Sequence, residues 1–247
     1  MRILLELSYC GSAYYGWQIQ PDVITVQGEI NRVLSLLYGE KITTYGSSRT
    51  DRGVHAKSFF CHFDTQKSFD IKRLPFAMNA NLQKDISVIS AKEVPSDFHA
   101  RFCVKSKTYE YLIWNLPTRN ALYADRALHW WYDIDAERAD KAAKDLIGTH
   151  DFAAFKAQGS PVETTVRTIY DASVTRDGDF IKIRVSGDGF LYNMVRIIVG
   201  TLLYMACGKI PFDAMPDIIK SLDRTKAGPT VGPEGLYLIK TEYKNGI

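Results

Sequence analysis

The sequence predicts an α+β fold: two similar subdomains with fused antiparallel sheets, helices packed on one face and a central cleft. One reason is a hairpin signal, because Asp177-Gly178 separates two strand-like runs, residues 166–175 and 180–186. A second reason is that each half runs strand, helix and then strands, with apolar helical stripes that need a sheet to cover. The 247 residues are enough for two small domains. We expect an N-terminal subdomain at residues 1–103 and a C-terminal one at residues 104–247.

The first half is expected to open with a strand at residues 2–8. A helix over residues 26–38 follows, because its apolar residues recur at helical spacing. Thr25 is a typical N-cap for this helix and Gly39 a typical stop. Further elements of this half are strands at residues 41–45, 54–63 and 86–94 and a helix at 71–82.

The second half begins with a strand that ends near residue 114 and places Tyr109, Tyr111 and Ile113 on one side. Asp188 is a candidate cap for the apolar helix that follows the hairpin. The remaining elements of this half are helices at residues 136–147, 190–206 and 212–222 and a strand at 235–243.

Charge and cysteine usage exclude several classes of protein. The net charge is only +3, and the excess lies in residues 1–110, which hold 14 Lys and Arg against 11 Asp and Glu. This is a weak indication of an anionic partner. The four cysteines form no CxxC pair and the five histidines have no zinc-site spacing, so we expect reduced thiols and no metal.

Membrane insertion and secretion are not expected. The N-terminus lacks a signal-peptide pattern, and the most apolar segment, residues 190–206, is too short for a typical span and contains Asn193 and Arg196. A cytoplasmic location follows as the expectation.

The most informative stretch is the turn around Asp51, which lies between Arg49 and Arg52 and just before Gly53. Glycine tolerates positive φ, so the chain can turn sharply after the carboxylate. Two neighbouring cations would favour the ionised form of Asp51. A fixed carboxylate can act as nucleophile, base or charge stabiliser. The alternative interpretation is an ordinary surface turn.

Two aromatic segments each leave two interpretations open. The loop at residues 10–24, rich in Gly, Tyr and Trp, is either a turn packed on the core or a mobile lid on which bases stack. Tyr109 and Tyr111 either pack in a core or form a platform for bases.

Arg196 lies within the apolar helix, and a buried arginine needs a partner. Asn193 and Gly200 share its face, and Gly200 would let a backbone or a ligand come close. As a hypothesis, Arg196 pairs with Asp51 of the other half. The alternatives are a structural ion pair, or a side chain whose head reaches water.

These residues also match a family. The chain resembles the TruA-type tRNA pseudouridine synthases along nearly its whole length, and Ser48 stands where that family usually has Gly. The matching blocks, in family order, are Tyr14-Tyr15-Gly16-Trp17-Gln18, Thr25-Val26-Gln27-Gly28, Arg49-Thr50-Asp51-Arg52-Gly53-Val54-His55-Ala56, Phe98-His99-Ala100-Arg101-Phe102, Lys107-Thr108-Tyr109-Glu110-Tyr111, Gly148-Thr149-His150-Asp151-Phe152, Phe190-Leu191-Tyr192-Asn193-Met194-Val195-Arg196 and Gly235-Leu236-Tyr237-Leu238.

The resemblance implies the pseudouridine synthase fold and the isomerisation of uridine to pseudouridine in the anticodon stem-loop of tRNA, at positions 38 to 40. It further implies a homodimer that needs no metal or cofactor. By the same resemblance, Asp51 is the catalytic aspartate and Tyr109 stacks on the target base. Arg196 pairs with the aspartate, and Arg49 helps to hold the base flipped out.

Two other functions remain open at this point. One is an RNA-binding domain without catalysis, with the aromatic strand as its platform. The other is a glycoside-type hydrolase, which normally needs a second carboxylate about 5–10 Å from the first.

Overall fold

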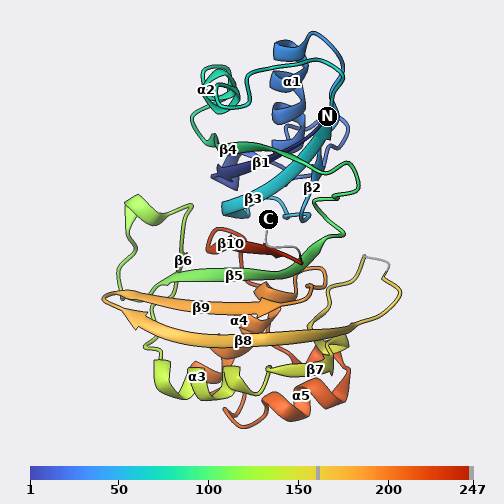
Figure 1. Ribbon diagram of the computed structural model, residues 1–247. Helices are drawn as coiled ribbons and strands as arrows, with labels where there is room; N and C mark the ends of the chain where they lie inside the picture. Colours follow the sequence, from blue (N-terminus) through green and yellow to red (C-terminus); the bar gives the residue numbers. More distant parts are fainter. Residues whose placement is uncertain (160–161, 245–247) are drawn as a thin grey trace. The chain divides into compact units, whose positions relative to one another are not determined.

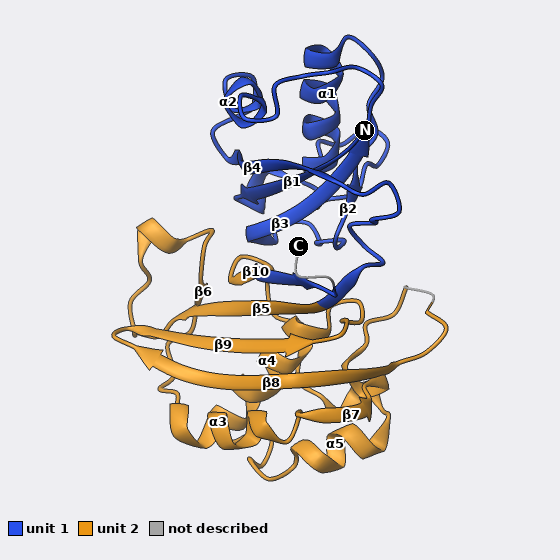
Figure 2. Cartoon of the chain, viewed as in Figure 1, with its two compact units in different colours: residues 1–105, 238–247 blue, residues 106–237 orange. Residues whose placement is uncertain are grey.

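The computed structural model describes residues 1–159 and 162–244 of the chain, which divide into two compact units. The first comprises Met1–Lys105 and the described residues from Leu238 onward, and the second is Ser106–Tyr237 (Figure 2). The C-terminal subdomain was expected to keep residues 238–247. The described residues from Leu238 onward group instead with the first unit, where the last strand lies beside β3.

The first unit is a sheet with helices beside it (Figure 1). Its strands lie in the order β4-β1-β3-β10, with the short β2 paired to β3. The pairs of β1 with β3, β1 with β4 and β2 with β3 are antiparallel. The elements are β1 (Arg2–Tyr9), α1 (Val26–Tyr38), β2 (Tyr45–Gly46), β3 (His55–Asp64), α2 (Leu74–Asn79), β4 (Ile86–Val94) and β10 (Leu236–Tyr243), which begins in the second unit.

Helix α1 follows the expected pattern from end to end. The Thr25 hydroxyl accepts a hydrogen bond from the Gly28 N–H at 3.2 Å, and Gly39 ends the helix with φ +61°. Ile30, Val33 and Leu34 are fully buried. The helix therefore contributes an apolar face to the core of this unit.

The second unit holds an antiparallel sheet in the order β5-β9-β8-β7, to which β6 adds a parallel pair with β5. Helix α3 packs against β8 and against α4. The α+β class and the mostly antiparallel pairing are confirmed. The elements are β5 (Val104–Trp114), which begins in the first unit, β6 (Leu128–His129), α3 (Ala136–Lys144), β7 (Gly148–Asp151), β8 (Val166–Asp177), β9 (Phe180–Gly187), α4 (Met194–Ala206) and α5 (Met215–Ser221).

The hairpin of β8 and β9 forms as predicted, with Asp177 opposite Phe180 and Gly178 at φ +57°. The start of the apolar helix was predicted wrongly. Helix α4 begins at Met194, after a turn in which the Met194 N–H binds the Leu191 carbonyl. Asp188 does not cap it, because its carboxylate accepts from the Thr168 N–H at 3.0 Å.

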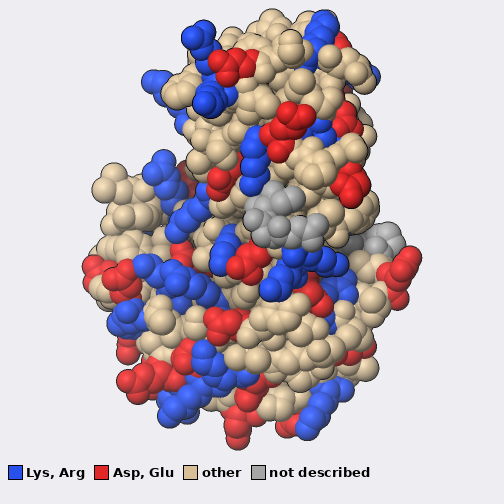
Figure 3. All heavy atoms as spheres, viewed as in Figure 1, with Lys and Arg blue, Asp and Glu red and all other residues tan. Residues whose placement is uncertain are grey.

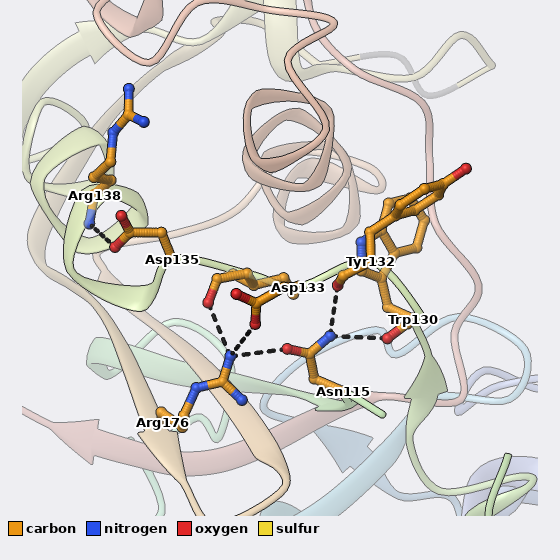
Figure 4. A network of polar contacts seen from close by, with 8 residues as sticks. Asn115, Trp130, Tyr132, Asp133, Asp135, Arg138 and Arg176 are labelled. Carbon is orange, nitrogen blue, oxygen red and sulfur yellow. Dashed lines mark hydrogen bonds and ion pairs between the residues drawn. The ribbon is translucent and has the colours of Figure 1, made fainter. Parts of the chain in front are cut away.

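A polar network fixes the far end of β8 (Figure 4). One Arg176 nitrogen donates to Asn115 Oδ1 at 2.9 Å, to the Ile134 carbonyl at 2.9 Å and to Asp133 at 3.2 Å. The Asn115 amide donates in turn to the carbonyls of Trp130 and Tyr132, both at 2.8 Å. The network ties the hairpin to the segment that leads into α3.

Across residues 1–159 and 162–244, no helix combines the length and the apolar character that crossing a membrane requires.

Candidate active site

Asp51 sits in the sharp turn that the sequence predicted. The Val54 N–H binds the Asp51 carbonyl at 3.1 Å, and Gly53 takes φ +78° at the third position of the turn. The Gly53 N–H binds the Tyr14 carbonyl at 3.3 Å. Asp51 itself is half-buried. The carboxylate is therefore carried on a backbone that is hydrogen-bonded both within the turn and to a neighbouring loop.

The loop at residues 10–24 is packed on the core near this turn. Tyr14 and Trp17 are 3% and 2% exposed, and the Trp17 ring lies 4.1 Å from that of Phe59. The Trp17 N–H binds the Thr50 carbonyl at 3.0 Å. Gly16 has φ +86°, and a Cβ there would lie 2.5 Å from the Thr50 oxygen. The loop is a support for the Asp51 turn, which favours the first of its two interpretations.

The two arginines that flank Asp51 are both exposed. The Arg52 guanidinium lies 4.2 Å from the centroid of the Tyr15 ring, a cation–π contact. Tyr15 remains 41% exposed. Arg52 is thus held against the loop, whereas Arg49 lies exposed on the approach to the turn.

Several supporting residues were missed by the sequence reasoning. The Tyr9 hydroxyl lies 2.8 Å from that of Thr50, and the Gly11 N–H donates to His55 Nδ1 at 3.0 Å. A Cβ at Gly11 would lie 2.0 Å from the Val54 carbonyl oxygen. The glycines of the loop were a signal in the sequence for these contacts, because a glycine often marks close backbone approach.

Cys10 lies beside this support with a shifted acidity. A hydrogen bond with His55 lowers the pKa of the Cys10 thiol to about 6, and burial opposes the shift. The Ser12 hydroxyl is 3.4 Å from the sulfur. The hydrogen bond with His55 therefore favours the thiolate form of Cys10.

In the second unit, Tyr109 and Tyr111 lie on one face of β5, as predicted, and point to different partners. Tyr109 is 7% exposed, and its ring meets that of Phe190 edge to face at 5.1 Å. Tyr111 is fully buried and donates its hydroxyl proton to the Gly232 carbonyl at 2.7 Å. Burial raises the pKa of Tyr111 well above its ordinary value. Tyr111 is thus a core residue.

Arg196 lies in the first turn of α4, half-buried. Its Nε donates to the Val231 carbonyl and its Nη1 to Asn193 Oδ1, both at 2.7 Å. A Cβ on Gly200 would lie 1.9 Å from the Pro229 carbonyl oxygen, so a backbone comes close on this face, as expected. These contacts fix the plane of the guanidinium.

The residues named from the sequence are shared between the units: Asp51 and Arg49 belong to the first, Tyr109 and Arg196 to the second. The pairing of Asp51 with Arg196 stays a prediction. Among the described side chains, no group of three or more His, Cys, Asp or Glu is arranged to hold a metal ion.

Comparison with known proteins gives consistent matches over almost the full chain. A family model described as "tRNA pseudouridine synthase" matches residues 7–103 and 142–244. A tRNA pseudouridine synthase A of Thermoanaerobacter sp. (strain X514) is 46% identical over 242 residues, which are 98% of this chain and 99% of the relative. The proteins of the same name from Acetivibrio thermocellus and Halalkalibacterium halodurans are 45% and 42% identical, over 98% and 99% of this chain and 99% and 94% of their own length. The chain therefore belongs to the tRNA pseudouridine synthase A family.

Proposed function

We propose that this protein isomerises uridine to pseudouridine in the anticodon stem-loop of tRNA, at positions 38 to 40, with Asp51 as its catalytic carboxylate. Family membership supports the reaction. The observation that carries the assignment of Asp51 is the turn itself, which holds one half-buried carboxylate on a braced backbone. A preorganised charge of this kind needs no rearrangement when the reaction begins.

The chemistry requires that the bond from uracil N1 to C1′ breaks, that the base turns, and that C5 bonds to C1′ and loses its proton. An ionised carboxylate serves this reaction in one of two ways. It attacks or stabilises C1′, or it removes the proton at C2′ to give a glycal. Both routes use a single carboxylate, and we expect neither metal nor cofactor to take part.

The detached uracil must be retained, and Tyr109 is proposed to do this by stacking on the target base. The contact with Phe190 sets the plane of its ring, and the neighbouring strand β9 supports it. We propose that Arg196 pairs with Asp51, because the Val231 carbonyl and Asn193 already orient its guanidinium. Exposed Arg49 would contact the flipped-out nucleotide.

Extruding a nucleotide costs a few kcal/mol of stacking and pairing, which phosphate contacts must offset. Figure 3 shows Lys and Arg interspersed with Asp and Glu over the face that it draws. On this face, RNA contacts would therefore depend on individual arginines and lysines. We further propose that the protein works in the cytoplasm as a homodimer, so that one tRNA can touch both subunits.

The test is tritium release from tRNA labelled at uracil C5, followed by mapping of the pseudouridines formed. The wild type is expected to release tritium from positions 38 to 40. Asp51→Asn is expected to release none while binding tRNA within a few-fold of the wild type, since it removes one charge beside many phosphate contacts.

Asp22→Asn is the matched control, because Asp22 is an exposed carboxylate of the same unit whose φ of +60° an asparagine tolerates. It is expected to keep full activity. Tritium release by Asp51→Asn at the wild-type rate would refute the assignment. If the wild type binds tRNA but releases no tritium, the protein is an RNA-binding protein and not an enzyme.

A further inference from the structure

A second aromatic cluster lies in the first unit, at the opposite end of β3 from the Asp51 turn. We name it the Phe102 platform; it consists of Tyr45, His62, His99, Arg101 and Phe102. The Tyr45 ring stacks on that of His62 at 5.1 Å and 22°. His99 lies 4.7 Å from His62 and 4.3 Å from Phe102, and it is inclined to Phe102 by 34°. Phe102 is 70% exposed and Tyr45 49%.

The platform is held by hydrogen bonds from both sides. The Ala100 N–H donates to His62 Nδ1 at 3.2 Å, and the Arg101 N–H donates to His99 Nδ1 at 3.1 Å. Strand β2 places Tyr45 opposite His62, and the Tyr243 hydroxyl binds the Ala100 carbonyl at 3.0 Å. Phe102 is therefore presented to solvent from a braced segment, although packing of the core does not require it there.

The charges of the platform suit a nucleic acid. Burial lowers the pKa of His62 to about 4, and the pKa of His99 is lowered by burial and by Arg2 and Arg101. Both shifts favour the neutral imidazole. His62 is only 1% exposed and backs the platform from below, so the aromatic faces open to solvent are mainly those of Phe102 and Tyr45. The Arg101 guanidinium lies 5.8 Å from the Phe102 centroid. The nearby carboxylate of Asp64 is engaged by Arg2 at 2.7 and 2.8 Å.

We propose that the Phe102 platform is a second RNA-binding site, which takes an unpaired base of the substrate on Phe102 while Arg101 contacts the adjoining phosphate. Aromatic faces beside a cation are the usual means of binding a single-stranded base without reading its identity. This proposal rests on the proposed function, since it assumes that RNA is the substrate.

The base on the platform is not the base that reacts. His62 lies eight residues along β3 from Val54 at the Asp51 turn, which is roughly 25 Å of extended chain. The platform would therefore hold the RNA at a separate point and fix its register while a different nucleotide is flipped.

The experiment compares tRNA affinity for Phe102→Ala and Phe102→Trp by fluorescence anisotropy, with single-turnover rates at saturating enzyme. We expect Phe102→Ala to raise the Kd about 10-fold, the loss typical of one stacked base, and to keep the saturated rate. Phe102→Trp is expected to retain affinity. Arg101→Gln is expected to reduce the slope of log Kd against log salt concentration by about 1, which is the contribution of one phosphate contact.

Phe76→Ala is the matched control, because Phe76 is 76% exposed on α2 of the same unit and lies outside the platform. It should leave the Kd unchanged. Equal Kd values for Phe102→Ala and Phe76→Ala, with both variants folded, would overturn the proposal. So would a loss of tRNA affinity that tracks dissociation of a protein oligomer in sedimentation, because Phe102 would then meet another protein surface.

Failure of this site and failure of the proposed function are distinguishable. If the wild type forms pseudouridine and Phe102→Ala binds tRNA normally, only the platform is refuted. If the wild type forms no pseudouridine and its RNA affinity still depends on Phe102, only the reaction is refuted.

Discussion

The hydroxyls of Tyr9 and Thr50 lie 2.8 Å apart in the interior of the first unit, where the two residues are 5% and 6% exposed. Tyr9 ends strand β1, and Thr50 directly precedes Asp51. The bond therefore joins the central part of the sheet to the backbone that carries the candidate catalytic carboxylate. We therefore expect Tyr9 to act as a positioning residue for Asp51.

Tyr9→Phe tests this link. The variant keeps the ring that meets Phe59 at 5.6 Å and removes one buried hydrogen bond, so we expect about 1 kcal/mol lower stability in urea unfolding. We also expect kcat to fall several-fold with KM for tRNA unchanged. Tyr170→Phe is the control, because Tyr170 is 51% exposed. A stability loss with unchanged kcat would mean that Tyr9 supports the fold alone.

Gly16 supplies a second test of the same support. Alanine there would combine positive φ with a Cβ 2.5 Å from the Thr50 oxygen and 3.1 Å from the Asp51 carbonyl carbon. The turn would have to move, so we expect Gly16→Ala to lose most of its pseudouridine formation and more than about 2 kcal/mol of stability.

Gly178→Ala separates the effect of strain from that of contact. Gly178 also has positive φ, +57°, but nothing lies within 4 Å of a Cβ there. We expect it to cost about 1 kcal/mol and to leave activity intact. Similar losses of activity in the two variants would show that the approach of Gly16 to Thr50 is not what matters.

The parts of the fold that sequence predicted are those set by local chemistry. Helix α1 has a side-chain cap at Thr25 and a left-handed stop at Gly39, and its span agreed with the expectation. The hairpin depended on two turn residues. Helix α4 starts four residues late because Asn193 adopts φ +59° before it, which the apolar pattern does not reveal.

What sequence could not predict is contact between distant segments. Arg176 binds Asn115 and Asp133, which are 61 and 43 residues away, and no periodicity links them. The same holds for the candidate site. Gly53 predicted the turn at Asp51. Tyr9 lies 41 residues before Thr50, and nothing in the sequence predicted that the two residues would be in contact.

Asn193 offers a test of the proposed role of Arg196. Asn193→Gly removes the amide that accepts from Arg196 Nη1 at 2.7 Å and keeps the left-handed backbone, since glycine tolerates φ +59°. The guanidinium keeps its bond to Val231 but loses part of its orientation. A hydrogen bond to a charged group is worth about 1.5–3 kcal/mol, so we expect the single-turnover rate to fall about 10-fold or more.

Leu222→Gly is the matched control, because Leu222 also has positive φ, +57°, and is 50% exposed. It should relieve strain without changing the rate. If Asn193→Gly reacts as fast as Leu222→Gly, the orientation of Arg196 by Asn193 has no part in the reaction.

Cys10 gives a pH-dependent prediction. Its pKa is lowered to about 6, mainly by the hydrogen bond with His55. Because the pKa is lowered, the thiolate persists down to about pH 6. The rate of Cys10 alkylation by iodoacetamide should therefore rise between about pH 5 and 7 and then level off, whereas the rate for an ordinary thiol rises near pH 8.5. Cys61 is fully buried, and burial raises the pKa of its thiol, so it should not react in the folded protein.

Mass spectrometry of the alkylated peptides resolves Cys10 from the other cysteines. Ser12→Ala is expected to move the midpoint slightly upward, because the Ser12 hydroxyl lies 3.4 Å from the sulfur and contributes less than His55. A Cys10 midpoint near pH 8.5 in the wild type would contradict the contact with His55. His55 directly follows the Asp51 turn in sequence and accepts from Gly11, so this titration reports whether the support of the turn is assembled in solution as the structure describes it.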